Sequence, residues 1–79
     1  MKIYPNIRNL REDHDLTQTQ LAKQLNTSQK TYSRYETGEH NIPTEILIEL
    51  ADFYSVSVDY LLGRTTQKTP YPKTKKSGE

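Results

Sequence analysis

Residues 16–38 read LTQTQLAKQLNTSQKTYSRYETG, and this stretch opens with a clear signal for the start of a helix. Thr17 is followed three positions later by Gln20, which is the spacing of a capping box. Leu16 and Leu21 flank the cap at the spacing of a hydrophobic staple, and Leu21 begins an apolar stripe. The pattern therefore predicts a short amphipathic helix that begins just after Thr17.

A second helix follows almost at once in the same stretch. Asn26 predicts the end of the first helix, because asparagine adopts the left-handed conformation more readily than most residues. Ser28 can cap the next helix, which we expect over residues 29–37 with its end at Gly38. Two helices joined by so short a turn must cross steeply.

The flanking sequence predicts three more helices and no strand. We expect helices over residues 5–14 and 45–54, and a short helix that begins after Ser57 and ends at Gly63. The sequence thus predicts a compact all-α fold of five helices.

The helix expected over residues 29–37 has two different sides. One side is expected to face the core and carries Tyr32, Tyr35 and Glu36. The opposite side carries no carboxylate and consists of Gln29, Lys30, Ser33, Arg34 and Thr37. Amide, ammonium and guanidinium groups read base edges in the major groove, whereas an ordinary solvated face usually includes acids.

Arg11 and Glu36 each fall on the inward side of their helices. A lone charge there would be costly to desolvate, so we expect the two side chains to form an ion pair with a structural role. The alternative is that both reach solvent past the edge of the core.

Composition limits the classes of protein that this chain can belong to. It has 79 residues, no cysteine and 32% hydrophobic residues, so we expect one small domain without disulfides or thiolate metal sites. Residues 1–63 carry six basic and nine acidic side chains, a net charge of −3, whereas residues 64–79 have a net charge of +4. We expect a domain over 1–63 and a basic, disordered tail over 64–79.

The ordered set of these motifs over residues 7–63 resembles the Cro and lambda-repressor-like helix-turn-helix family, also called the XRE family. The matching stretches include Leu16 to Ala22, Ser28 to Arg34, Glu36 with Gly38, and VSVDYLLG at 56–63. The resemblance implies a lambda-repressor-like fold in which the helix over residues 29–37 is the recognition helix.

The resemblance also implies roles for particular residues on double-stranded DNA. Base reading would fall to Gln29, Lys30, Ser33 and Arg34. Phosphate contacts would come from Thr17, Gln18, Lys23, Thr37, Asn41 and Thr44, with Gln18 also bracing the recognition helix. Dimer contacts would come from Val58, Asp59 and Tyr60, although Tyr60 could equally be a core residue.

Several positions depart from the pattern of the family. Asn26 replaces a turn glycine, and Thr27 replaces an apolar residue. Tyr32 stands where a branched aliphatic side chain normally packs, so the core must accommodate a larger ring with a hydroxyl. The loop that follows Gly38 reads Glu-His-Asn, where relatives often have lysine or arginine, and this predicts weak phosphate binding by the loop.

We therefore expect a non-enzymatic regulator that binds a near-palindromic operator as a homodimer, most simply a bacterial or phage repressor in the cytoplasm at the nucleoid. No nucleophile elbow, phosphate loop, metal-ligand spacing or membrane span is found, and no cofactor is expected. Two alternatives stay open. The chain could be an antitoxin that holds a toxin, or an adaptor that has lost base reading; an antirepressor protein is a further candidate partner.

Overall fold

A computed structural model describes residues 3–70, and in this part of the chain the secondary structure is entirely helical. The helices are α1 (Pro5–Asp13), α2 (Gln18–Gln24), α3 (Gln29–Thr37), α4 (Thr44–Tyr54) and α5 (Val58–Leu61). The predicted all-α, five-helix fold is confirmed. Some bounds differ slightly from expectation: α1 ends at Asp13, with His14 as its C-cap, and α4 begins at Thr44 after Pro43. In the same way, α2 ends at Gln24 and α5 ends at Leu61, each two residues before the expected stop.

The helix starts follow the local signals in the sequence. Thr17 and Gln20 form the complete capping box at the start of α2. The side chain of Ser28 accepts a hydrogen bond from the amide of Thr31 at 3.1 Å, and Ser57 accepts one from the amide of Tyr60 at 3.0 Å. Each cap satisfies an amide that has no partner within its own helix, which fixes where the helix begins.

Three helices end with a non-glycine residue in the left-handed conformation. Asn26 after α2 has φ 59°, as expected, and Asp15 and Ser55 have φ 56° and 55° after α1 and α4. In each case the next amide bonds back to a carbonyl five residues earlier, for example Thr27 N to Ala22 O at 2.9 Å. These bonds satisfy carbonyls at the helix ends and turn the chain sharply.

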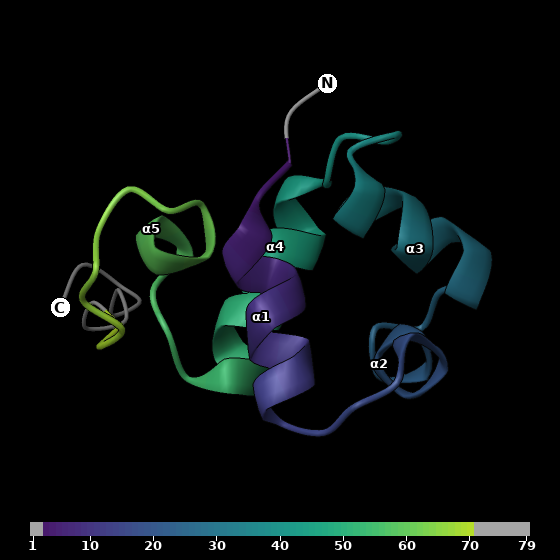
Figure 1. Ribbon diagram of the computed structural model, residues 1–79, viewed down its shortest axis with the longest axis horizontal. Helices are drawn as coiled ribbons and strands as arrows, with labels where there is room; N and C mark the ends of the chain where they lie inside the picture. Colours follow the sequence, from purple (N-terminus) through teal and green to yellow (C-terminus); the bar gives the residue numbers. More distant parts are fainter. Residues whose placement is uncertain (1–2, 71–79) are drawn as a thin grey trace, which may run out of the picture.

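Every helix contributes to one core. Its buried members are Ile7, Leu10, Leu21, Ala22, Leu25, Tyr32, Leu50, Ala51, Tyr54, Val56 and Leu61. α1 contacts both α3 and α5, whereas α2 packs on α3 and α4 packs on α5. In Figure 1, α2 and α3 form one end of the molecule and α5 the other, with α1 and α4 between them.

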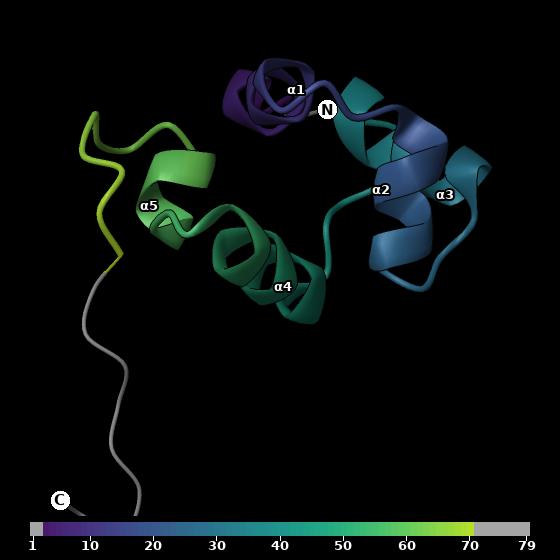
Figure 2. The same cartoon turned by 90° about the horizontal axis from the view of Figure 1, so that it is seen from below.

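The arrangement of α2 and α3 leaves one side of α3 outside the core. In Figure 1, α2 is seen almost end-on, whereas α3 runs across the view, so the two helices cross steeply as their short connection predicts. The view from below in Figure 2 again shows the pair at one end, remote from α5. The tertiary structure therefore presents α3 at the periphery.

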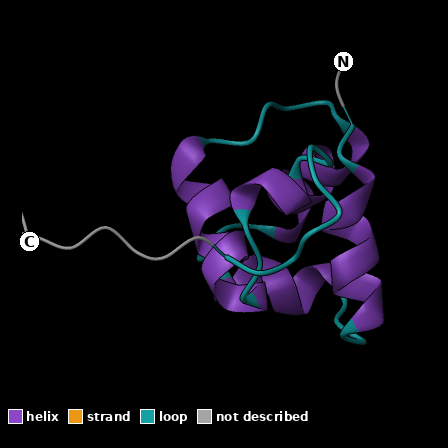
Figure 3. Ribbon diagram, turned by 90° about the vertical axis from the view of Figure 1, so that its left-hand side faces the viewer, coloured by secondary structure: helices purple, strands orange, loops and turns teal. Residues whose placement is uncertain are grey.

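The described part of the expected tail, residues 64–70, folds back beside α5. The amide of Ser57 donates to the carbonyl of Lys68 at 2.9 Å, and Arg64 forms an ion pair with Asp59 at 3.2 Å. Figure 3 looks onto this side and shows the loop crossing in front of the helices. The expected boundary after Gly63 remains a prediction, and the rest of the expected tail, residues 71–79, lies outside the described residues.

Candidate nucleic-acid interface

The outward side of α3 carries the residues expected to read bases. Tyr32 and Glu36 are the buried residues of the helix, so the opposite side points away from the core. Gln29, Lys30 and Thr37 are exposed there, and Ser33 and Arg34 are half-buried. The structure thus brings all five side chains of the expected acid-free face onto one accessible helix surface.

Arg11 and Glu36, the two charges expected to meet, lie in direct contact between α1 and α3. Arg11 Nε donates to Glu36 Oε2 at 2.7 Å and Nη2 donates to Oε1 at 3.2 Å. The third guanidinium nitrogen, Nη1, donates to the carbonyl of Leu16 at 2.8 Å. With side-chain exposures of 12% and 4%, the pair is shielded from water, and its two-point geometry holds α1 against α3.

Glu36 also receives two neutral donors. The Tyr32 hydroxyl donates to Oε2 at 2.5 Å, and Gln18 Nε2 donates to Oε1 at 3.0 Å. Burial alone would raise the pKa of Glu36, but the hydrogen bonds from Arg11, Tyr32 and Gln18 outweigh it and hold the pKa below its usual value of 4.5. Glu36 is therefore ionised at neutral pH.

Tyr32 was expected only to fill the core, and its role as a donor to Glu36 was missed. The one available signal was the spacing, since residues four apart share a helix side. Burial, followed by the hydrogen bond to Glu36, raises the pKa of Tyr32 well above its ordinary value of 10.0. The hydroxyl therefore keeps its proton and remains a donor throughout the neutral range.

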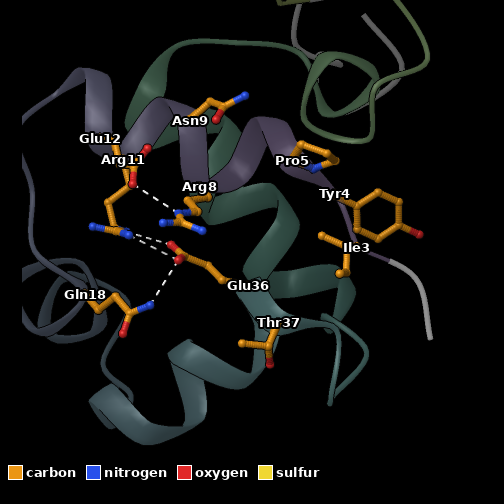
Figure 4. A pocket seen from close by; sticks show the side chains of 10 residues that line it. All are labelled: Ile3, Tyr4, Pro5, Arg8, Asn9, Arg11, Glu12, Gln18, Glu36 and Thr37. Atoms are coloured by element: carbon orange, nitrogen blue, oxygen red, sulfur yellow. Dashed lines mark hydrogen bonds and ion pairs between the residues drawn. The ribbon is translucent and has the colours of Figure 1, made fainter.

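A hydrogen-bonded chain links this buried carboxylate to the outer face of α3. Gln18 Nε2 donates to Glu36, and Gln18 Oε1 accepts from Gln29 Nε2 at 2.7 Å. Figure 4 shows Gln18, Arg11 and Glu36 turned toward one another. An ionised carboxylate can only accept, so Gln18 must turn its amino group inward and its oxygen toward Gln29. The remaining N–H and the oxygen of the Gln29 amide are then left as a donor and an acceptor.

Four of the six residues expected to contact phosphates lie on α2 or α3 or at the start of α2. Gln18 and Thr37 both line an open cavity of about 640 Å³ between α1 and α3, together with Arg8 and Arg11 (Figure 4). Lys23 is exposed on α2. Thr17 is also exposed, but its hydroxyl oxygen already accepts the amide hydrogen bond of the capping box.

Asn41 lies in the loop that joins α3 to α4, Thr44 is the first residue of α4, and both are exposed. Ile42 and Pro43 lie between them, and Pro43 is the N-cap of α4. The structure therefore leaves both polar side chains accessible, beside the C-terminal end of α3 rather than along its outer face.

The expected dimer residues lie on α5, at the opposite end of the molecule from α2 and α3 (Figure 1). Val58, Asp59 and Tyr60 are half-buried. Lys68 Nζ lies 5.7 Å from the centre of the Tyr60 ring, and Arg64 pairs with Asp59. Residues 64–68 of the same chain therefore contact part of the expected dimer surface.

The described residues offer no group of three or more His, Asp or Glu side chains that could hold a metal ion. None of the helices over residues 3–70 is long and apolar enough to cross a bilayer.

Lowering the pH is expected to weaken the fold through Glu36. Its pKa is depressed in the folded state, so its contribution to the unfolding free energy is complete above about pH 4.5. That contribution is lost as the pH falls through the folded-state pKa, where the unfolded chain binds more protons. Urea titrations between pH 7 and pH 3 on the wild type and Glu36→Gln measure the effect. If the unfolding free energy of the variant fell as steeply with decreasing pH as that of the wild type, the role assigned to Glu36 would be contradicted.

Comparison with known proteins agrees with this geometry. The family model described as Helix-turn-helix matches residues 7–61. The uncharacterized HTH-type transcriptional regulator YobD of Bacillus subtilis (strain 168) is 41% identical over 64 residues, which cover 81% of this chain and 57% of that protein. The cryptic phage CTXphi transcriptional repressor RstR of Vibrio cholerae serotype O1 is 40% identical over 65 residues, which cover 81% of this chain and 57% of the repressor.

A relative of a different kind is the antitoxin PezA of Streptococcus pneumoniae serotype 4. It is 34% identical over 65 residues, which cover 82% of this chain and 41% of the antitoxin. The chain spans about half the length of the curated relatives it matches. The similarity therefore concerns the part of these proteins that corresponds to the five-helix domain.

The family model covers more than half of the chain, and its match spans the capped helix pair and the core described above. The protein belongs to the Cro and lambda-repressor-like helix-turn-helix family, also called the XRE family.

Proposed function

We propose that this protein binds duplex DNA in a sequence-specific way and represses transcription as a dimer. The observation that carries the proposal is the accessible, acid-free side of α3, with Gln29 held by Gln18. A helix of this size fits the major groove, and its amide, ammonium and guanidinium groups match base edges there. The similarity to named regulators and to the repressor RstR supports the same function.

The orientation of the Gln29 amide indicates one base preference. With one N–H used on Gln18, the amide keeps one donor and one acceptor. Adenine presents a complementary acceptor and donor, N7 and the N6 amino group, in the major groove. Arg34 and Lys30 suit guanine, which presents two acceptors. We therefore expect an operator half-site that contains an adenine opposite Gln29 and guanine nearby.

The scarcity of positive charge in the recognition unit supports a dimer. Between residues 17 and 38 the basic residues are Lys23, Lys30 and Arg34, so one protomer neutralises few phosphates and binds weakly. Two protomers on a near-palindromic site would recover affinity, with their recognition helices about 34 Å apart. Contacts through Val58, Asp59 and Tyr60 would place α5 at the dimer axis, away from α3.

Selection of bound sites from random duplexes at fixed salt tests this function. The expected result is an enriched motif with two inverted half-sites whose centres lie about one helical turn apart. Enrichment of a single half-site would support sequence-specific binding but contradict binding as a dimer. No enrichment above the starting pool would contradict sequence-specific binding.

Single substitutions are expected to separate base reading from phosphate binding. Gln29→Ala and Arg34→Ala should each cost about 1–3 kcal/mol on the selected site and relax the preference at particular base pairs. Lys23→Ala should weaken binding to every duplex alike and reduce the salt slope by about one unit. Fluorescence anisotropy on matched and single-mismatch duplexes measures both effects. Equal losses on all duplexes for all three variants would contradict the assignment.

A second candidate function is that of an antitoxin, which the similarity to PezA favours. In that case the same domain would regulate its own promoter while another part of the protein holds a toxin. Co-expression with candidate neighbouring genes, followed by purification of a stable complex that relieves toxicity, distinguishes this function from that of a simple repressor.

A further inference from the structure

Tyr32 combines two properties that separate it from the other buried aromatic residue of the core. Its relative exposure is 0%, and its hydroxyl nevertheless has a strong acceptor, Glu36 Oε2, at 2.5 Å. Tyr54 is also buried, but its hydroxyl has no hydrogen-bond partner among the described residues. The two tyrosines therefore differ in what the oxygen does, although both rings fill the core.

The Tyr32 hydroxyl completes the hydrogen bonding of Glu36. Oε2 accepts from Arg11 Nε and Tyr32, and Oε1 accepts from Arg11 Nη2 and Gln18 Nε2. An ionised carboxylate offers about four lone-pair sites, and four donors occupy them here. With both oxygens fully engaged, Glu36 is held in one orientation.

We propose that the Tyr32 hydroxyl is a positioning group for base reading, because it fixes Glu36 so that Gln18 can hold Gln29. This inference rests on the proposed function for its consequence on DNA, but the positioning itself does not depend on DNA. A branched aliphatic side chain at this position would fill the same core without supplying the donor.

Gln18 is the most weakly held of the donors to Glu36, and this explains how loss of the Tyr32 hydroxyl would affect Gln29 at the surface. Arg11 is anchored by two bonds to the carboxylate and one to the carbonyl of Leu16. Gln18 is half-buried and makes one bond to Glu36, so it is the donor that can move. When the hydroxyl is removed, Oε2 is left short of a donor in a buried place, which is unfavourable. Gln18 then shifts toward Oε2 and loosens its bond to Gln29.

Side-chain amide NMR tests the positioning without DNA. In the wild type, the Gln18 and Gln29 side-chain amides should show dispersed shifts and slow exchange compared with Gln24, an exposed glutamine of α2. In Tyr32→Phe, which keeps the ring and removes the hydroxyl, both amides should move toward the Gln24 values. Gln18 and Gln29 amides that already resemble Gln24 in the wild type would overturn the proposal, even if the variant does not fold.

DNA binding tests the consequence. For Tyr32→Phe, the ratio of affinities for the selected site and a site mismatched opposite Gln29 should fall roughly five- to tenfold, less than the full contribution of a bidentate contact. The ratio of affinities for the selected site and a site mismatched opposite Arg34 should be the same as in the wild type. Tyr54→Phe is the matched control, because it also removes one buried tyrosine hydroxyl, and it should leave the ratio and both amides unchanged.

The outcomes are distinguishable. An equal loss on all duplexes with unaltered amides would make Tyr32 merely structural and overturn the proposal, as would an unchanged ratio despite mobile amides. If the wild type itself does not discriminate between duplexes, the proposed function fails, while the amide spectra still decide whether the hydroxyl positions Gln18 and Gln29.

Discussion

Glu36→Ala is expected to lower the unfolding free energy by about 3–5 kcal/mol, the cost of removing one partner from a buried ion pair. Arg11 would keep its charge at 12% side-chain exposure and would keep its hydrogen bond to the Leu16 carbonyl, but it would lose both bonds to the carboxylate. The Tyr32 hydroxyl and the Gln18 amide would lose their acceptor as well. At about 0.05–0.15 kcal/mol per residue, a chain of 79 residues has a total stability of roughly 4–12 kcal/mol, so this change removes a large part of it.

Thermal unfolding followed by circular dichroism measures the effect. At roughly 4–8 °C per kcal/mol for a domain of this size, Tm should fall by at least about 12 °C. Glu12→Ala provides the matched control, because it breaks another ion pair of α1, that of Arg8 and Glu12, whose side chains are 64% and 50% exposed. That pair should contribute at most about 0.5 kcal/mol. Similar losses for the two variants would contradict the role assigned to Glu36.

The second large effect is expected at Leu21, whose side chain is completely buried on the inward side of α2. Leu21→Ala should lower the unfolding free energy by about 2–5 kcal/mol, because it removes buried methyl groups and leaves a cavity. α2 has only seven residues, so packing rather than intrinsic helix stability holds it against α3. Urea unfolding at neutral pH measures the loss.

Ile48→Ala is the control for Leu21→Ala. It deletes the same number of carbons from α4, but the Ile48 side chain is 50% exposed and the loss should stay within about 0.5 kcal/mol. If Leu21→Ala were as mild as Ile48→Ala, α2 would not be held by the core in the way that the structure shows. Partial unfolding of the pair α2 and α3 should also weaken DNA binding in Leu21→Ala.

The helix boundaries and the two faces of α3 could be predicted from the sequence because their causes are local. A cap joins residues three apart, as in Thr17 with Gln20, and a helix face joins residues three or four apart. The left-handed conformations of Asp15 and Ser55 were not predicted, because neither residue marks a left-handed turn as strongly as glycine does. Their conformation follows from the bonds that close each helix end.

Local patterns were therefore enough to predict five helices, a capped helix pair and an outer face of α3 without acids. They could not predict that Gln18, Gln29 and Glu36 form one hydrogen-bonded chain, that Tyr32 supplies a donor to it, or that residues 64–68 lie against α5. Gln18 is 18 residues from Glu36 and 11 from Gln29, beyond the reach of helix periodicity. Such contacts depend on how α1, α2 and α3 cross, and that crossing is set by the packing of the whole core.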